Sequence, residues 1–176
     1  MTRLGPSRDT QAVPLPAVAA TGALLLPLEA AAMQPPAASR VRIGGHWLRR
    51  KGEFHVTILG RALGPRLRAL FDEPDLQLAL ASLDWRVQRL HAYDFLGKLK
   101  PALHGAVPCY SVIEHVRVPG MLELYAALAE RVPGFPACPQ PHVTHYVLGD
   151  ANGIGVPDAA SLAAYRIRPV QEAELA

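Results

Sequence analysis

The segment FHVTILG occupies residues 54–60, and a closely similar segment, HVTHYVLG, occupies residues 142–149. Both contain His-Val-Thr and both continue through apolar residues to Leu-Gly. Such β-branched and aromatic runs favour strands, in which successive side chains point to opposite faces. Each segment is therefore predicted to be a strand that buries its valine and presents a histidine and a threonine on the other face: His55 with Thr57, and His142 with Thr144.

The recurrence of this tripeptide is more than chance predicts. Seven histidines and five threonines placed at random give roughly 0.2 His-x-Thr pairs. Beyond residue 21, Thr57 and Thr144 are the only threonines in the chain. The two tripeptides are therefore candidates for parts of one shared site.

These residue types suit chemistry on a phosphoryl group. If the two strands face each other across a cleft, two hydroxyls can donate to its non-bridging oxygens. One imidazole can take a proton from the attacking oxygen while the other gives one to the leaving oxygen, and both titrate near neutral pH. The sequence thus predicts His55 and His142 as catalytic residues and Thr57 and Thr144 as phosphate-binding residues.

The pair of motifs resembles the 2H phosphoesterase superfamily, which includes the bacterial RNA 2′,3′-cyclic phosphodiesterases, or 2′-5′ RNA ligase-like proteins. The resemblance covers about residues 22–170. It implies a bilobal, pseudo-twofold arrangement of two antiparallel sheets with helices on the outside and a central cleft. It also implies metal-independent, cofactor-free hydrolysis of a 2′,3′-cyclic phosphate or related 2′-linked phosphodiester, on an RNA terminus or a nucleotide. Which histidine is base and which is acid stays open.

Two positions differ from the family pattern. His145 follows the second threonine, where the family usually has an apolar residue. Many members also have a basic residue soon after the second motif, whereas the next basic residue here is Arg166. His142 and His145 lie three apart, so on a strand they face opposite sides and cannot share a metal ion. We predict that His145 is hydrogen-bonded behind the sheet.

The rest of the chain predicts an α+β fold, because short strands and helices alternate irregularly. Strands 41–48 and 53–59 are expected to form a hairpin around a polar turn, and the glycines and prolines of residues 97–108 predict a loop. The other predicted strands are 23–28, 85–95, 110–118, 142–148 and 166–170, with helices at 65–71, 74–83 and 121–132.

The N-terminal residues differ in composition from the rest. Residues 1–21 are predicted to be a Pro/Ala-rich leader and residues 22–176 a single domain. The apolar run 12–28 has the outline of a signal peptide, but prolines interrupt it and Asp9 lies upstream, so we expect a cytoplasmic protein rather than an exported one. No uncharged apolar run beyond residue 30 approaches the ~20 residues of a membrane span, and we expect a monomer without a membrane partner.

Composition and charge exclude further classes of protein. Half of the residues are apolar and 19% are charged, which excludes global disorder, and two cysteines exclude a disulfide scaffold. Residues 40–68 contain eight basic residues and one acidic residue, which could attract a polyanion or form a solvated hairpin tip. Arg50 in this stretch is a candidate for substrate binding. Tyr146, on the face of Thr144, and Trp47 are candidates for stacking on a base, with core packing as the alternative.

Other functions stay open from the sequence. The cleft could hydrolyse cyclic oligonucleotides or 2′-5′ oligoadenylate. It could also bind nucleotides without catalysis, or the protein could be structural, with two exposed tripeptides and no ligand.

Overall fold

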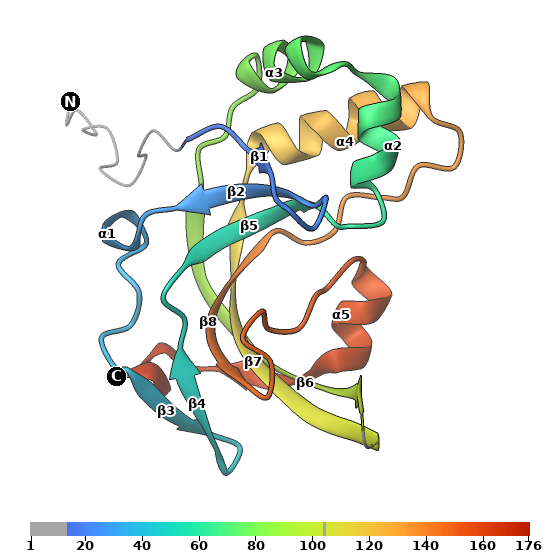
Figure 1. Ribbon diagram of the computed structural model, residues 1–176. Coiled ribbons are helices and arrows are strands. Elements are labelled where there is room, and N and C mark those ends of the chain that lie inside the picture. Colours follow the sequence, from blue (N-terminus) through green and yellow to red (C-terminus); the bar gives the residue numbers. More distant parts are fainter. Residues whose placement is uncertain (1–13, 104) are drawn as a thin grey trace, which may run out of the picture.

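Nine strands form one antiparallel sheet among residues 14–103 and 105–176, the residues that this computed structural model describes. The chain is therefore an α+β protein, as predicted. The sheet runs in the spatial order β1 (Ala17–Val18), β2 (Leu24–Leu28), β5 (Phe54–Leu59), β8 (His142–Leu148), β7 (Gly105–Arg117), β6 (Gln88–Ala102) and β9 (Arg166–Val170). A hairpin of β3 (Arg40–Ile43) and β4 (His46–Arg50) joins it through β8 (Figure 1).

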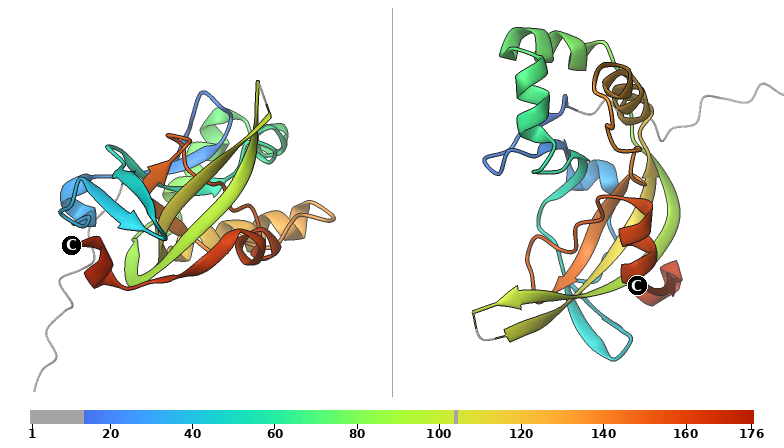
Figure 2. Two further views of the ribbon diagram at one scale, coloured as in Figure 1. Left: turned by 90° about the horizontal axis from the view of Figure 1, so that it is seen from below. Right: turned by 90° about the vertical axis from the view of Figure 1, so that its right-hand side faces the viewer.

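Most of the helices lie at one end of the sheet (Figure 2). These are α2, α3 and α4, and the hairpin of β6 and β7 projects at the other end (Figure 2). In α4, close to the predicted helix 121–132, an apolar stripe of Met121, Leu124, Tyr125 and Leu128 is buried. The helical elements are α1 (Ala30–Met33), α2 (Gly64–Leu70), α3 (Glu73–Ala81), α4 (Pro119–Arg131), α5 (Ala159–Tyr165) and a final 3-10 turn (Glu172–Leu175).

The prediction of two separate sheets is wrong, because β8 joins the strands of both expected lobes. One edge of β8 pairs with β7, and its other edge pairs with β5 at Val143 and with β4 at Tyr146 and Val147. The apolar side chains nevertheless form distinct cores. One lies between β2, β5 and helices α2–α4, another under the β3–β4 hairpin, and a third under α5 and residues 154–156.

The predicted hairpin of strands 41–48 and 53–59 is also wrong. The chain turns earlier, at Gly44 and Gly45, whose φ angles of 57° and 84° lie in the left-handed region that glycine adopts most readily. This turn makes a hairpin of β3 with β4. The following strand, β5, pairs with β2 and β8 instead.

Within the predicted loop 97–108, residues 97–102 and 105–108 belong to strands. They form the outer half of the β6–β7 hairpin, in which Leu99 pairs with Pro108 and Pro101 with Ala106. Beyond Leu96 no third strand pairs with β6, and beyond Tyr110 none pairs with β7 in the described part of the chain. The prolines are tolerated there because their missing N–H groups face an unpaired edge.

A strand break and a bulge lie side by side in the middle of the sheet. Strands β4 and β5 follow one another along β8, separated by residues 51–53 (Figure 1). At the same level β8 has an extra residue, His145, because Thr144 pairs with Ile113 while Tyr146 pairs with Val112. The backbone N–H of Lys51 donates to the carbonyl of His145 across this irregularity, at 2.8 Å. After the bulge, each residue of β8 therefore points to the sheet face opposite to the one that simple alternation predicts.

The described part of the N-terminal region joins the sheet. Strand β1 lies inside the predicted leader 1–21 and pairs with β2, so the sheet begins before residue 22. Residues 1–13 of that leader lie outside the described residues.

Candidate active site

The two His-Val-Thr tripeptides lie on neighbouring strands and pair with each other. Val56 of β5 is directly opposite Val143 of β8, and both are fully buried. Because the strands are antiparallel, this register places His55 beside Thr144 and Thr57 beside His142. All four polar side chains alternate with buried ones and are partly exposed on one face of the sheet. The structure therefore brings together the four predicted site residues, on adjacent strands of one sheet instead of on two facing sheets.

The ring of His142 is held by the chain that precedes β8. Its Nδ1 donates to the carbonyl oxygen of Gln140 at 3.0 Å, so the neutral ring has its lone pair on Nε2. Burial lowers the pKa of His142, the bond to Gln140 opposes this, and the charge of His115 lowers the pKa further. The outcome is a pKa below the ordinary value, which favours a free Nε2 at neutral pH.

His55 has a different charged environment. Burial lowers its pKa, and the nearby positive charges of Lys51 and His142 act in the same direction, while Glu53 opposes them. The pairing of Val56 with Val143 makes the two histidines diagonal neighbours on adjacent strands. Both are therefore poised to accept a proton near neutral pH rather than to carry one permanently.

Lys51 is a cation beside the site that was not among the predicted site residues. Burial lowers the pKa of its ammonium group, whereas Glu53 and Asp150 raise it. Lys51 lies in the strand break between β4 and β5, where its backbone N–H bonds to His145 of β8, and its charge lowers the pKa of His55. A basic residue four positions before the first histidine was the available signal, but without the pairing of strands it could not be assigned to the site.

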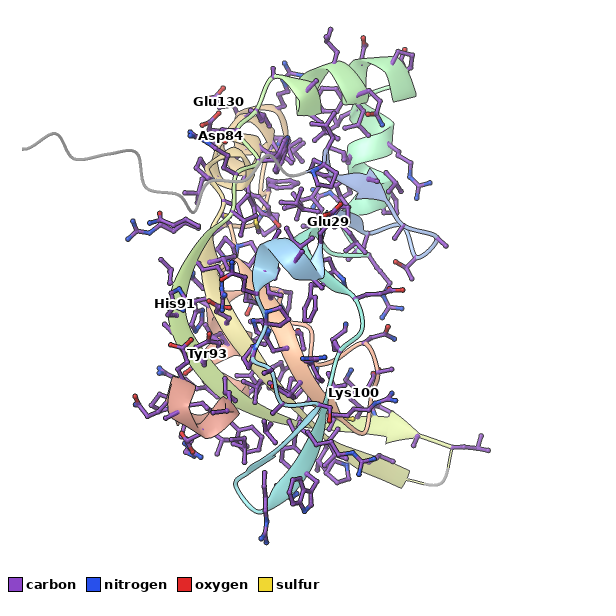
Figure 3. All side chains as sticks on the ribbon, turned by 90° about the vertical axis from the view of Figure 1, so that its left-hand side faces the viewer. Glu29, Asp84, His91, Tyr93, Lys100 and Glu130 are labelled. Atoms are coloured by element: carbon purple, nitrogen blue, oxygen red, sulfur yellow. The ribbon has the colours of Figure 1, made fainter. Side chains whose placement is uncertain are left out.

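A loop borders the same face on the side of Thr144. A Cβ atom added at Gly153 would lie 3.1 Å from Thr144 Cγ2 and 3.2 Å from Ser111 Oγ. The ammonium group of Lys100, labelled on β6 in Figure 3, holds this loop through bonds of 2.6 Å to Asp150 Oδ2 and to the carbonyl oxygen of Gly153. The loop thus limits the space beside the second tripeptide.

The next strands carry further polar groups on this face. His115 of β7 is directly opposite His142, and its Nε2 lies 2.8 Å from Asp94 Oδ2. Arg166 Nε donates to the other oxygen of Asp94, also at 2.8 Å. A hollow of about 220 Å³ opens beside this group. Its lining includes His91 and Tyr93 of β6, which are labelled in Figure 3.

The opposite face contains a buried ionic cluster. His145 Nε2 lies 2.8 Å from Glu114 Oε2, and Arg89 Nε donates to Glu114 Oε1 at 2.9 Å. Glu114 and His145 are both fully buried, and Arg89 also donates to the carbonyl oxygen of Met33. The prediction that His145 is hydrogen-bonded behind the sheet is confirmed. The cluster ties the second motif strand to β6, β7 and α1.

Tyr146 and Arg50 do not lie with the four motif residues. Because of the bulge at His145, Tyr146 faces away from Thr144; it is fully buried, and its hydroxyl donates to the carbonyl oxygen of Ala38. The prediction that the two side chains share a face is therefore wrong. Arg50 is opposite Tyr146 and donates to the carbonyl oxygens of Pro36 and Ala37. Its side chain therefore holds this segment of the chain against β4. Trp47 is 61% exposed on β4, and its role in stacking stays a prediction.

Comparisons of the chain with protein-family models, with curated proteins and with solved structures gave no match. Within residues 14–103 and 105–176, no group of three or more His, Cys, Asp and Glu side chains is arranged to hold a metal ion. None of the helices in those residues is both long enough and apolar enough to cross a membrane.

Proposed function

We propose that the protein is a phosphodiesterase that opens a 2′,3′-cyclic phosphate or a related 2′-linked phosphodiester of RNA or a nucleotide. One observation carries the proposal: Val56 pairs with Val143, so two imidazoles and two hydroxyls share one face of neighbouring strands. The repeated histidine–threonine pair supports it as well. A phosphoryl group needs an acid, a base and donors for its oxygens, and these four side chains supply all three functions.

The register suits an in-line displacement. His55 and His142 are diagonal neighbours across the strand pair, and such positions are roughly 7–8 Å apart. A phosphorus atom between them can have its attacking oxygen near one ring and its leaving oxygen near the other. Thr57 and Thr144 occupy the other diagonal, where their hydroxyls can donate to the non-bridging oxygens.

In the proposed reaction, water forms the new P–O bond and gives its proton to one histidine. The bond from phosphorus to the 2′ or 3′ oxygen breaks, and the other histidine, protonated in the bound complex, gives its proton to that oxygen. The product is a phosphate monoester with a free neighbouring hydroxyl. No step calls for a metal ion, so we expect turnover to persist in excess chelator.

The proposal also needs a recess over the four side chains. We expect the two halves of the sheet, with α2–α4 on one side and the loop 149–157 with α5 on the other, to flank this recess as two lobes. The contact of Gly153 with Thr144 supports a boundary on the second side. Lys51, in the strand break between β4 and β5, would bring positive charge to the first side, and the lowering of the pKa of His55 by its charge supports this.

The direct test is turnover of 2′,3′-cyclic mononucleotides and of a short RNA that ends in a cyclic phosphate, followed by ³¹P NMR. We expect a phosphate monoester to appear with the wild-type protein and not with a variant that lacks both His55 and His142. Tight nucleotide binding without any turnover would instead support a binding module. Release of products from cyclic oligonucleotides or 2′-5′ oligoadenylate alone would change the substrate class.

The threonines provide a graded prediction. Thr57→Val or Thr144→Val removes a hydroxyl that donates to a charged oxygen and preserves the shape of the side chain. Such bonds contribute about 1.5–3 kcal/mol, so kcat/KM is expected to fall by about 10–100-fold. Thr→Ser at the same position restores the donor and is the matched control. Equal activity of the valine and serine variants would contradict a phosphate contact.

Lys51 provides an electrostatic prediction. Lys51→Gln is expected to lower kcat/KM several-fold and to reduce its dependence on salt, because a cation near an anionic substrate is screened by added ions. Arg42→Gln removes the same charge from an exposed position on β3, which pairs only with β4 among the described strands, and serves as the control with a cyclic mononucleotide as substrate. The prediction fails if both variants show the same activity and the same salt dependence.

A further inference from the structure

The β3–β4 hairpin has an outward face of charged and aromatic side chains. Arg40 is directly opposite Arg49 in the register of the two strands. Arg42 is likewise opposite Trp47. Opposite residues of an antiparallel pair point to the same side. All four are exposed, whereas the apolar residues that alternate with them belong to the core under the hairpin. We call these four residues the hairpin face.

The arginines of the hairpin face have no acidic partner. No ion pair joins any of them to a carboxylate among the residues that the structure describes. The sequence has no Asp or Glu at all within residues 30–52. Free cations beside an exposed aromatic ring suit a single-stranded nucleic acid, because arginines bind phosphates and the ring stacks on a base. The charge of this face thus favours a polyanion over an acidic or apolar protein surface of mixed charge.

The hairpin face continues the sheet face that carries the motif residues. Arg49 is directly opposite Val147 of β8, so their side chains lie on the same side of the sheet. A Cβ atom at Gly153 would lie 3.4 Å from Val147 Cγ1 and 3.1 Å from Thr144 Cγ2, so these two side chains also share a side. They are three residues apart, and the bulge at His145 brings them to one side. The face of the second tripeptide therefore meets the hairpin face at Arg49.

The strands set the order of groups along this surface. β4 and β5 follow one another along β8, so the hairpin lies beyond Lys51 when viewed from the first tripeptide. Three residue steps along β8 from Thr144 and two along β4 from Arg49 to Trp47 give a path of roughly 17 Å, at about 3.4 Å per residue. A mononucleotide held by the four motif residues is too short to cover this path. An RNA strand of several nucleotides is long enough.

We propose that the hairpin face binds the nucleotides that precede the cyclic phosphate, so that the substrate is a single-stranded RNA of several nucleotides. The arginines bind phosphates of the strand, and Trp47 stacks on one of its bases. A 2′,3′-cyclic phosphate uses both oxygens of the terminal ribose, so the rest of the chain can only extend in the 5′ direction, towards the hairpin. The position of the cyclic end rests on the proposed function, whereas RNA binding by the hairpin concerns the folded protein alone.

The test measures binding of a labelled six-nucleotide RNA that ends in a 3′-phosphate, by fluorescence anisotropy at several salt concentrations. Trp47→Ala is expected to weaken binding about 5- to 100-fold, the usual effect of losing one stacked base. Arg40→Gln with Arg42→Gln is expected to reduce the slope of log Kd against log salt by about 1.4, because each phosphate contact of a single strand contributes about 0.7. Neither change should alter kcat/KM for a 2′,3′-cyclic mononucleotide, whereas both should lower kcat/KM for a six-nucleotide RNA with a cyclic end.

Two matched controls separate the hairpin face from charge and shape alone. Trp47→Phe keeps a ring that can stack and should retain most of the affinity for RNA. Arg66→Gln with Arg68→Gln removes two exposed charges from α2, at the other end of the sheet from the hairpin (Figure 1), and should reduce binding less than the hairpin pair. Equal losses from the two arginine pairs, or equal affinities of the alanine and phenylalanine variants, would overturn the inference.

The two proposals can fail separately. RNA binding that the folded hairpin variants leave unchanged would overturn this inference even if cyclic mononucleotides are hydrolysed. Binding of an acidic peptide in preference to RNA, lost in the same variants, would overturn it too, because the hairpin would then be a protein-docking surface. RNA binding that depends on the hairpin, in a protein that hydrolyses no cyclic phosphate, would refute the proposed function and support the hairpin face as the RNA-binding surface.

Discussion

Replacing either His55 or His142 by alanine is expected to lower kcat for a 2′,3′-cyclic phosphate by about 10²–10⁴-fold, the usual contribution of one positioned acid or base. The two side chains act on one phosphorus atom in one step. The double variant should therefore lose much less than the product of the single losses. Both rings lie on the exposed side of strands whose opposite side is buried, so the fold should persist.

The measurement is the steady-state rate of hydrolysis at saturating substrate, with circular dichroism and thermal melting as checks of the fold. His91→Ala, which removes an exposed imidazole elsewhere, should retain wild-type activity. Full activity in a folded His55→Ala or His142→Ala protein would remove the basis of the proposed mechanism. Loss in only one of them would show that a single imidazole does the acid and base work.

The second large effect is on stability. Glu114→Ala is expected to reduce the free energy of unfolding by about 3–5 kcal/mol, because it leaves charged and polar partners buried without their counterpart. Arg89 and His145 would lose an acceptor, and the backbone N–H of His91 would lose its bond of 3.3 Å. Urea unfolding at pH 7 measures the change. Glu130→Ala, an exposed carboxylate on α4, should change stability little.

The same cluster should make stability depend on pH. Burial raises the pKa of Glu114, but the hydrogen bonds from His145 and Arg89 outweigh it, and the pKa lies below its ordinary value. The stabilisation is therefore present above the ordinary pKa of a glutamate and is lost as the pH falls towards the pKa in the folded protein. The Glu114→Ala protein should lack this acidic decline. A parallel decline in both proteins would assign the effect to other groups.

The sequence predicted the motif strands well because side-chain alternation is a local property. His55, Thr57, His142 and Thr144 lie on the exposed face that the period of two indicates, and Val56 and Val143 are buried. The helix predicted at residues 121–132 likewise agrees with α4, which spans Pro119–Arg131. Which strands pair with one another could not be predicted, because pairing depends on contacts between segments that are distant in the sequence. Hence the single sheet and the β3–β4 hairpin differ from expectation.

The errors around the site have specific physical causes. The alternation of side chains predicted the wrong sheet face for Tyr146, because one extra residue, His145, interrupts the register of β8 with β7. The prolines at 101 and 108 indicated a loop because nothing in the sequence shows that they fall where the edges are unpaired. His115 and Asp94 carried no motif; only the register opposite His142 and a bond of 2.8 Å connect them to the site.

The position of β8 has a consequence for how the protein acquires its function. β8 lies between β5 and β7, whereas in the described sequence it comes long after β5, near α5, β9 and the final turn. Contacts between segments so far apart in sequence form slowly, since a long loop must close first. A nascent or truncated chain that ends before residue 142 can therefore contain the first tripeptide in a strand and still lack the assembled face. We expect activity to emerge only with completion of the sheet, in the last stage of folding.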